Sequence, residues 1–188
     1  MNDKQLNQCI INIATGSRKD LKDLYDAFDR VVFLYALSIV KDYHLAEDVM
    51  QETFLSIMKY ASSYQNKSKP KAWIFTIAKN ACLQALEKSH SNELNNDGIE
   101  TRFSYDEGLT KEGLNTIESL NILSTIERQI ISLYIFGGFK QTEIARLLDI
   151  PYLTVRSKYS YAIRKLKQFY NLRRDDNDTQ INCKDINM

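Results

Sequence analysis

The feature that most constrains this chain is a helical pattern that stops and restarts within a few residues near its C-terminal end. In KQTEIARLLDIPYLTVRSK (140–158), apolar residues recur at three- and four-residue steps up to the Leu-Leu pair, and the pattern resumes after Pro151. Asp149 is suited to a tight turn, and proline is favoured in the first turn of a helix. The pattern therefore predicts a short helix over 141–148, a tight turn, and a second helix over roughly 152–169 with Pro151 in its first turn.

The second helix of this pair is strongly basic, because residues 151–174 carry seven Lys and Arg and no acidic residue. Two helices joined by a tight turn form a helix-turn-helix, whose second helix can enter the DNA major groove. There Arg156 can pair with guanine edges. The candidate DNA-binding residues of this helix are Thr154, Arg156, Ser157, Lys158, Ser160, Tyr161, Arg164 and Lys165. The alternative is a basic amphipathic helix on the surface of an ordinary helical bundle.

The N-terminal half of the chain shows the same helical periodicity. Segment 21–40 becomes almost entirely apolar towards its end, so its second half is expected to be buried. Segment 44–61 has an apolar face that ends at Met58, and segment 71–89 has one that includes Trp73. The chain contains only six Gly and two Pro, too few for the many turns of a β-rich fold. The sequence therefore predicts an all-α fold.

One polar segment divides the helical pattern into two parts. Residues 91–116 are acidic and contain three of the six glycines. A flexible segment of this length has a relaxed span of roughly 28 Å and a full extension of about 85 Å, which suits two domains that contact separated points on one partner. The predicted organisation is a helical domain over 1–90, an acidic flexible linker over 91–116, a helix-turn-helix domain over 117–174, and a disordered tail over 175–188.

The cysteines and the N-terminal segment favour a reduced, cytoplasmic protein. Cys9, Cys82 and Cys183 are far apart and form no Cys-x-x-Cys pair, so neither a disulfide framework nor a zinc site is predicted. The first residues lack a basic segment followed by a long apolar core, so no signal peptide is predicted. The apolar stretch 31–40 is about half the length of a membrane span. We expect a cytoplasmic protein without a membrane partner.

Catalytic motifs are not evident in the sequence. The two histidines, His44 and His90, have no metal-ligand spacing, and no phosphate-binding glycine loop or nucleophile motif occurs. Asp48 and Glu52 are one turn apart and in principle form an acid pair, but an exposed helix face provides no pocket for a substrate. The sequence therefore disfavours an enzyme and predicts neither a cofactor nor a metal.

Two separate stretches resemble one known family. LSTIERQIISLYIFGGFKQTEIARLLDIPYLTVRSKYSYAIRKL, within 117–170, is similar to the promoter-binding C-terminal domain of sigma-70 family transcription initiation factors. AEDVMQETFLSIMKY followed by KPKAWIFTIAKN, within 17–90, resembles their N-terminal core domain. The compact two-domain layout resembles the extracytoplasmic-function group. The resemblance implies an initiation factor that binds core RNA polymerase and directs it to promoters, while the polymerase supplies the catalysis.

The resemblance also implies a polymerase-binding surface. Asp48, Gln51 and Glu52 have the spacing i, i+3, i+4, so they share one helix face opposite the apolar stripe. In the family this surface docks on a coiled coil of the polymerase β′ subunit, and carboxylates would meet basic residues there. Without the resemblance, the same pattern is that of a solvated helix face. The β flap of the polymerase, promoter DNA and an anti-sigma protein are the other partners that the family implies.

The family further implies two promoter contacts. The basic helix-turn-helix residues would read the −35 element, and the loop and helix after residue 63 would open the −10 element. Strand opening needs aromatic surfaces for unstacked bases and cations for phosphates. Trp73 is also a candidate core residue because of its spacing with apolar neighbours. The residues implied at the −10 element are Tyr64, Gln65, Asn66, Lys67, Lys69, Lys71, Trp73, Lys79 and Asn80.

The sequence departs from the family pattern at two places. After Asn80 the family usually has an Asp and basic residues, whereas this chain has Gln84, Glu87 and a single Lys88. In the recognition helix an Arg is common at the position of Tyr161, and a Gly at that of Leu153. Two further functions therefore stay open: a sigma-like co-regulator that cannot open DNA unaided, and an autonomous helix-turn-helix regulator.

Overall fold

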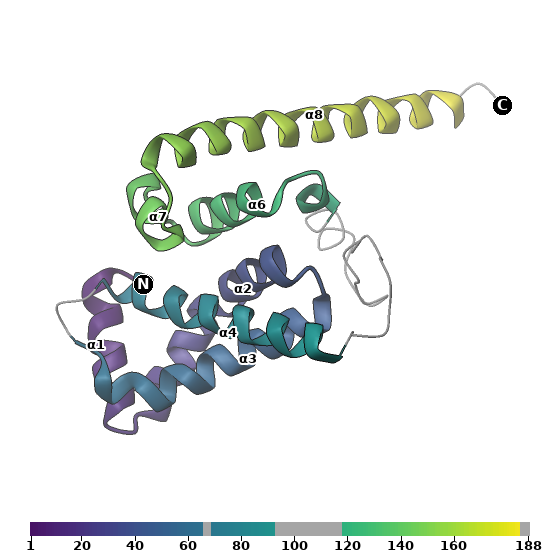
Figure 1. Ribbon diagram of the computed structural model, residues 1–188. Coiled ribbons are helices and arrows are strands. Elements are labelled where there is room, and N and C mark those ends of the chain that lie inside the picture. Colours follow the sequence, from purple (N-terminus) through teal and green to yellow (C-terminus); the bar gives the residue numbers. More distant parts are fainter. Residues whose placement is uncertain (66–68, 93–117, 185–188) are drawn as a thin grey trace.

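The computed structural model describes residues 1–65, 69–92 and 118–184, and it confirms the predicted all-helical fold (Figure 1). The N-terminal helices are α1 (Asp3–Ala14), α2 (Arg18–Val40), α3 (Tyr43–Tyr60), the short 3₁₀ helix η1 (Ala61–Ser63) and α4 (Pro70–Asn92). The C-terminal helices are α6 (Thr125–Ile131), the π-helix η2 (Ser132–Phe136), α7 (Gln141–Leu148) and α8 (Tyr152–Lys184). Most of the predicted linker, from residue 93 to 117, lies outside the described residues.

Helix α1 is not predicted by the sequence analysis, although its start carries a signal. The side chain of Asn2 accepts a hydrogen bond from the Gln5 backbone N–H at 2.9 Å, and the Gln5 side chain accepts one from the Asn2 backbone N–H at 3.0 Å. This reciprocal pair is a capping box, which satisfies two otherwise unpaired backbone donors. Leu6, Ile10 and Ile13 then follow at helical spacing and are buried. Helix α1 packs against α2, α4 and η1.

The turn before α7 requires glycine at two successive positions. Gly138 has a φ of +63°, the left-handed conformation that glycine adopts without a steric penalty. A Cβ on Gly137 would lie 2.7 Å from the carbonyl oxygen of Leu133 and 2.8 Å from the Phe139 ring. The same Leu133 carbonyl accepts a hydrogen bond from the Phe139 N–H at 3.0 Å. The chain therefore reverses tightly enough to bring Phe139 back against the helix it has just left.

The short first helix and the turn of the helix-turn-helix have the predicted bounds, with one correction at the proline. Helix α7 covers 141–148, and Asp149 adopts the left-handed conformation with a φ of +54°. Pro151 is not within the first turn of α8 but immediately precedes it, and its carbonyl accepts hydrogen bonds from Thr154 and Val155 at 3.0 and 3.2 Å. The fixed φ of proline still directs the chain into α8, because this residue occupies the N-cap position.

The N-terminal and C-terminal helices share their hydrophobic cores. One buried cluster joins Ile74 and Phe75 of α4 to Phe139 and Ile144, and a second joins residues of α2 and α3 to those of α6 and α8. The rings of Phe75 and Phe139 meet edge to face, with centroids 5.1 Å apart. Figure 1 shows α6 and α7 facing the layer formed by α2 and α4, with α8 on the far side. The two parts therefore form one packed body.

Helix α8 is longer than the predicted recognition helix. It continues to Lys184, into the acidic segment 175–188 that the composition predicts to be disordered, and residues 185–188 lie outside the described part. Residues 152–188 contain no Gly or Pro, so no helix-breaking residue ends α8 near residue 169. Within the described ranges, none of the helices combines the length and the apolar character needed to cross a membrane.

Candidate polymerase and nucleic-acid interfaces

Helix α3 presents the three predicted polymerase-binding residues on one open face. Asp48, Gln51 and Glu52 are exposed, whereas their sequence neighbours Val49 and Thr53 are buried. Asp48 and Glu52 line one wall of a groove of about 550 Å³ between α3 and α4. The opposite wall is formed by residues of α4, namely Ala81, Gln84, Ala85, Lys88 and Ser89. The carboxylates thus border a groove that is wide enough to receive side chains of a partner.

The same face of α3 continues into apolar residues that the sequence analysis did not assign to a site. Leu55 and Met58 are 55% and 50% exposed. Met58 was expected on the buried face, and its position one residue after the buried Ile57 rotates it out towards solvent. A second groove contains Glu52, Leu55 and Asn80. The acidic surface therefore continues directly into an apolar surface. In the sequence, the signal for this apolar surface is the spacing of Leu55 and Met58, which follow Glu52 at three-residue steps.

Gln84 is one of the departures from the family pattern, and the structure shows which surface of α4 it belongs to. Its side chain lines both grooves, beside Glu52 on α3. Lys88 lines the first groove on the same side of α4. Gln84 and Lys88 therefore belong to the surface that carries the candidate polymerase contacts rather than to the side of α4 that faces α7.

Two aromatic residues predicted at the −10 element lie together beside α1. The rings of Tyr64 and Trp73 have centroids 4.9 Å apart, and both residues are partly buried. The Tyr64 hydroxyl donates a hydrogen bond to the side-chain oxygen of Asn7 on α1. Burial, together with the nearby charge of Asp3, raises the pKa of the Tyr64 hydroxyl. Helix α1 thus fixes the position of the aromatic pair.

Three of the predicted −10 lysines face the C-terminal helices. Lys69 forms a salt bridge with Glu143 of α7, with Nζ 3.1 Å from the carboxylate. The Nζ of Lys71 lies 3.4 Å from the Gly137 carbonyl, and that of Lys79 lies 3.5 Å from the Leu147 carbonyl. Lys71 and Lys79 therefore contact backbone carbonyls at the C-terminal ends of η2 and α7, where the helix itself provides no hydrogen-bond donor.

The ion pair between α4 and α7 changes the titration of Glu143. Partial desolvation acts to raise the pKa of this carboxyl. Hydrogen bonds from the Lys140 backbone and the Lys69 ammonium, with the charges of both lysines, outweigh that effect and lower the pKa below its ordinary value of 4.5. The carboxylate is therefore the stable form across the neutral range, and the link between α4 and α7 persists there.

The remaining predicted −10 residues are dispersed. Gln65 is exposed two residues after the end of η1, and Asn66 and Lys67 lie outside the described residues. Asn80 is exposed beside α3, on the other side of α4 from Lys71 and Lys79. The structure therefore divides the predicted −10 residues among the aromatic pair, the lysines that face α7, and the α3 groove.

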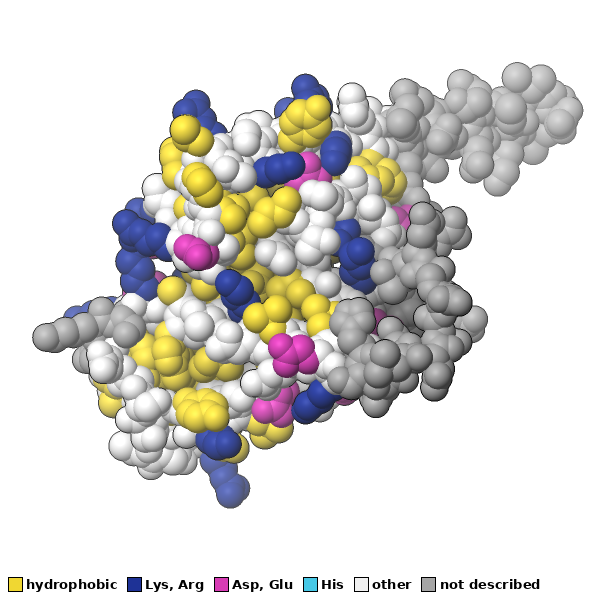
Figure 2. All heavy atoms as spheres, in the orientation of Figure 1, with side chains coloured by type: hydrophobic (Ala, Val, Ile, Leu, Met, Phe, Trp, Pro, Cys, Tyr) yellow, Lys and Arg dark blue, Asp and Glu magenta, His cyan; other side chains and the backbone are white. Residues whose placement is uncertain are grey.

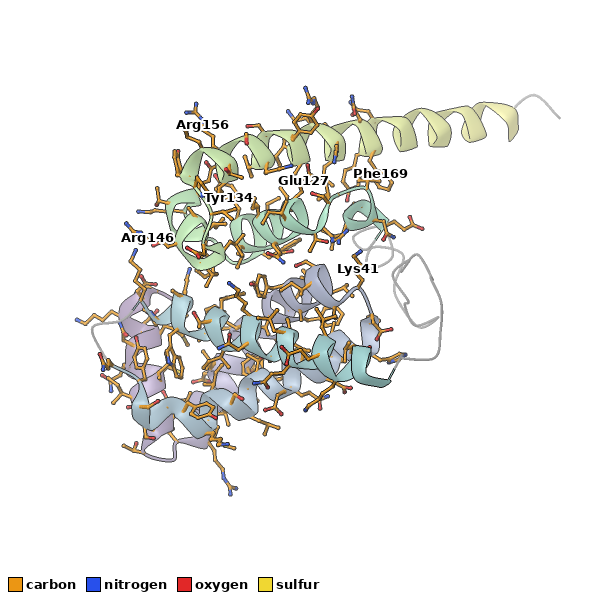
Figure 3. All side chains as sticks on the ribbon, in the orientation of Figure 1. Lys41, Glu127, Tyr134, Arg146, Arg156 and Phe169 are labelled. Atoms are coloured by element: carbon orange, nitrogen blue, oxygen red, sulfur yellow. The ribbon has the colours of Figure 1, made fainter. Side chains whose placement is uncertain are left out.

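Helix α8 presents an exposed stripe at helical spacing. Arg156, Ser157, Ser160, Tyr161 and Arg164 are exposed and follow one another at three- and four-residue steps. Figure 3 shows Arg156 pointing away from α6 and α7, and Figure 2 shows basic and hydrophobic side chains along the outer edge of α8. The Arg164 guanidinium lies 4.2 Å from the centroid of the Tyr161 ring, a cation–π distance. Thr154 and Lys158 are partly buried on the flanks of this stripe.

Lys165, by contrast, turns inward. Its Nζ lies 2.8 Å from the carboxylate of Glu127 on α6, and Glu127 is only 3% exposed (Figure 3). Burial acts to raise the pKa of Glu127, but hydrogen bonds from Lys165 and Ser124 outweigh it and the pKa is lowered. Sequence periodicity could not distinguish Lys165 from Arg164, because the buried carboxylate that attracts it lies far away in the sequence.

Arg128 is a buried charge that the sequence analysis missed. It is 4% exposed and donates hydrogen bonds to the Leu123 carbonyl at 2.6 Å and to the Thr125 hydroxyl at 2.9 Å. Its Nε also donates to the Ser38 carbonyl near the end of α2, at 3.2 Å. Burial lowers the pKa of Arg128, while the charge of Glu127 opposes the shift. Arg128 therefore links the C-terminal helices to α2.

Comparison with known proteins matches both parts of the chain. Residues 24–91 match the model of sigma-70 region 2, and residues 119–168 match that of sigma-70 region 4. The ECF RNA polymerase sigma factor SigL of Mycobacterium tuberculosis is 30% identical over 155 residues, which cover 78% of this chain and 86% of SigL. SigM of Bacillus subtilis, also an ECF sigma factor, is 28% identical over 160 residues, which cover 80% of this chain and 95% of SigM.

Solved structures show the same fold. The sigma factor RpoE from Bartonella quintana, in complex with the anti-sigma factor NepR, superposes with a TM-score of 0.66 at 24% identity. That match covers 81% of this chain and 98% of RpoE. CnrH, in complex with the cytosolic domain of CnrY, gives a TM-score of 0.63 at 19% identity and covers 89% of this chain and 98% of CnrH.

The two regions and the relatives together define the class: the chain belongs to the sigma-70 family, with regions 2 and 4. It is an ECF sigma factor, a non-enzymatic initiation factor that directs RNA polymerase to promoters through these two regions. The predicted resemblance is thereby confirmed. A region 2 that accompanies the helix-turn-helix also favours this function over an autonomous helix-turn-helix regulator.

Proposed function

We propose that Asp48, Gln51 and Glu52 form the centre of the surface through which this sigma factor binds core RNA polymerase. The observation that carries this proposal is the exposed acidic face of α3 beside a groove whose other wall is α4. A basic coiled coil of the β′ subunit would place cations against the two carboxylates and apolar side chains against Leu55 and Met58. The β flap is the proposed partner of region 4.

Charge reversal tests this surface. Asp48→Arg combined with Glu52→Arg should abolish co-elution with core polymerase, because like charges would then face each other across the interface. Asp23→Arg combined with Asp26→Arg is the matched control, because these exposed residues on α2 give the same change in net charge away from the groove. Both variants should keep the wild-type circular dichroism. Undiminished co-elution of the α3 variant would rule out the assignment.

We also propose that the exposed stripe of α8 reads the −35 element. Arg156 and Ser157 would contact base edges, and the flanking polar and basic residues would contact phosphates. Arg156→Ala should reduce discrimination at one position of the −35 element by about 1–3 kcal/mol, as expected for a bidentate contact to guanine. The exposed Lys167 is the control: Lys167→Ala should weaken binding to all −35 sequences equally.

The −10 element is proposed to be opened by region 2. Tyr64 and Trp73 would stack with unpaired bases, and Lys69, Lys71 and Lys79 would bind the phosphates of the separated strand. Gln65, Asn66, Lys67 and Asn80 are the further proposed contacts. The support for this proposal is the close pairing of the two rings together with the lysines along α4. Transcription by purified core polymerase from the DNA upstream of this protein's own coding sequence tests it, and a discrete start that depends on the protein is expected.

Several broader features belong to the same proposal. The boundaries 1–90 and 117–174 are proposed for the two domains, with 91–116 as an acidic flexible linker between them. An anti-sigma protein is a further proposed partner, because RpoE of Bartonella quintana was solved with one. Co-purification of the full chain from its native cells tests the anti-sigma partner.

The proposed localisation is the cytoplasm, because the protein acts on RNA polymerase and promoter DNA.

A further inference from the structure

Leu153 is the most exposed large hydrophobic residue in the described part of the chain, with 73% of its surface accessible. It is the second residue of α8. Burial of apolar surface stabilises a fold, and the apolar residues of a surface helix typically face the core. Leu153 instead projects into solvent, so its side chain contributes little to the packing of this domain. The exposed side chain is therefore available to contact a partner molecule.

The position of Leu153 relative to its neighbours indicates which partner. Arg156 and Ser157 follow it at i+3 and i+4, so the three residues lie on one face of α8. The same face continues through Tyr161 and Arg164, and residues 151–174 carry no acidic side chain. A leucine at the end of a stripe whose charged residues are all basic therefore faces whatever polyanion the stripe binds, which favours DNA over an apolar protein surface.

The major groove of DNA offers an apolar side chain one apolar group, the C5-methyl group of thymine. We propose that Leu153 packs against a thymine methyl group in the −35 element and so makes a thymine part of the sequence that this protein selects. The proposal rests on the assignment of the α8 stripe to the −35 element. Three residues along a helix advance about 4.5 Å, and one base pair rises about 3.4 Å. The thymine therefore lies within one or two base pairs of the base that Arg156 reads.

Replacement of thymine by deoxyuridine tests the proposal at the level of one methyl group. The assay measures binding of the holoenzyme, assembled from the full chain and core polymerase, to promoter DNA in which each thymine of the −35 element is replaced in turn. One replacement should weaken wild-type binding about three- to fourfold, the value expected for loss of one buried methyl group. The same replacement should not change binding by the Leu153→Ala variant, because this variant lacks the side-chain atoms that would contact the methyl group.

Neighbouring variants separate the possible outcomes. Tyr152→Ala removes an exposed aromatic side chain that lies about 100° around the helix axis from Leu153, and it should retain the sensitivity to deoxyuridine. If no thymine shows the effect while Arg156→Ala still alters −35 preference, the Leu153 proposal is wrong and the assignment of α8 stands. If Arg156→Ala also has no effect, the assignment of α8 itself fails. A loss for Leu153→Ala that is equal on all templates would indicate a contact with polymerase and would overturn the proposal.

Discussion

At the scale of single residues, Arg164 and Lys165 are adjacent in the sequence and have opposite surroundings. Arg164 is exposed and stacks on Tyr161, whereas the Lys165 ammonium contacts the buried carboxylate of Glu127. A basic residue on a recognition helix can therefore serve the stability of the domain instead of DNA binding. The distinction depends on where the neighbouring helix places an acid.

Lys165→Met should lower the free energy of unfolding by about 1–3 kcal/mol, because it leaves a buried carboxylate without its cation. Arg164→Met is the matched control and should leave stability within about 0.5 kcal/mol of wild type, since its side chain is on the surface. Urea denaturation measures both values. Equal stability of the two variants would show that the contact between Lys165 and Glu127 does not stabilise the domain.

The pH dependence of stability should report the same contact. Because the pKa of Glu127 is lowered in the folded protein, its contribution is present above the ordinary value of 4.5 and is lost as the pH falls through the folded pKa. Glu143 contributes in the same direction. Denaturation at several pH values between 7 and 3 should show a decline for the wild type, and Lys165→Met should show a smaller decline. An identical decline in both proteins would contradict this account.

At the scale of elements, the turn between η2 and α7 depends on the absence of a side chain at residue 137. Gly137→Ala should lower the free energy of unfolding by about 1–3 kcal/mol, because the new methyl group would overlap the Leu133 carbonyl and the Phe139 ring. Gly138→Ala meets only the flexible end of Lys71, at 3.7 Å, and should cost about 1–2 kcal/mol through its left-handed backbone alone. Thermal unfolding of both variants and of the double variant measures the two effects. No loss for Gly137→Ala would mean that the turn can relax.

Elements with a local cause were predictable from the sequence. The bounds of α7, the tight turn at Asp149 and the start of α8 follow from apolar spacing and turn chemistry. Phe75 was not assigned to the core, because its partners lie in other segments: Tyr35 on α2 and Phe139 in the turn before α7. Likewise, Lys71 and Lys79 lie on α4, within the predicted helical segment 71–89, but periodicity contains no information about the helices that face them. Local patterns specify the helices, whereas contacts between distant segments decide which of their faces stay open.

At the scale of the whole molecule, the two regions are packed together through shared hydrophobic clusters. The lysines proposed for the −10 element contact region 4 through Glu143 and through the carbonyls of Gly137 and Leu147. The exposed stripe of α8 that is proposed for the −35 element lies on the other side of region 4. The packing therefore covers one proposed DNA contact and leaves the other accessible.

A carbodiimide cross-link can test this packing in solution. This reagent joins a carboxylate to an amine that it contacts, so the free protein should yield a peptide that links Lys69 to Glu143. Glu143→Gln should abolish the product and serves as the control. Core polymerase and promoter DNA should lower the yield, because Lys69 would then leave Glu143 for a phosphate. Absence of the linked peptide from the free protein would show that the regions are apart in solution.

The accessibility of α8 has a consequence for the sequence of events at a promoter. With the roles proposed above, the packed protein can bind intact duplex DNA through α8, since this contact needs no rearrangement of the two regions. Strand separation must wait until region 4 has moved away from α4, because the cations it needs are occupied until then. The architecture thus orders the two steps in time: arrival at the correct site comes first, and the capacity to unwind it appears only afterwards.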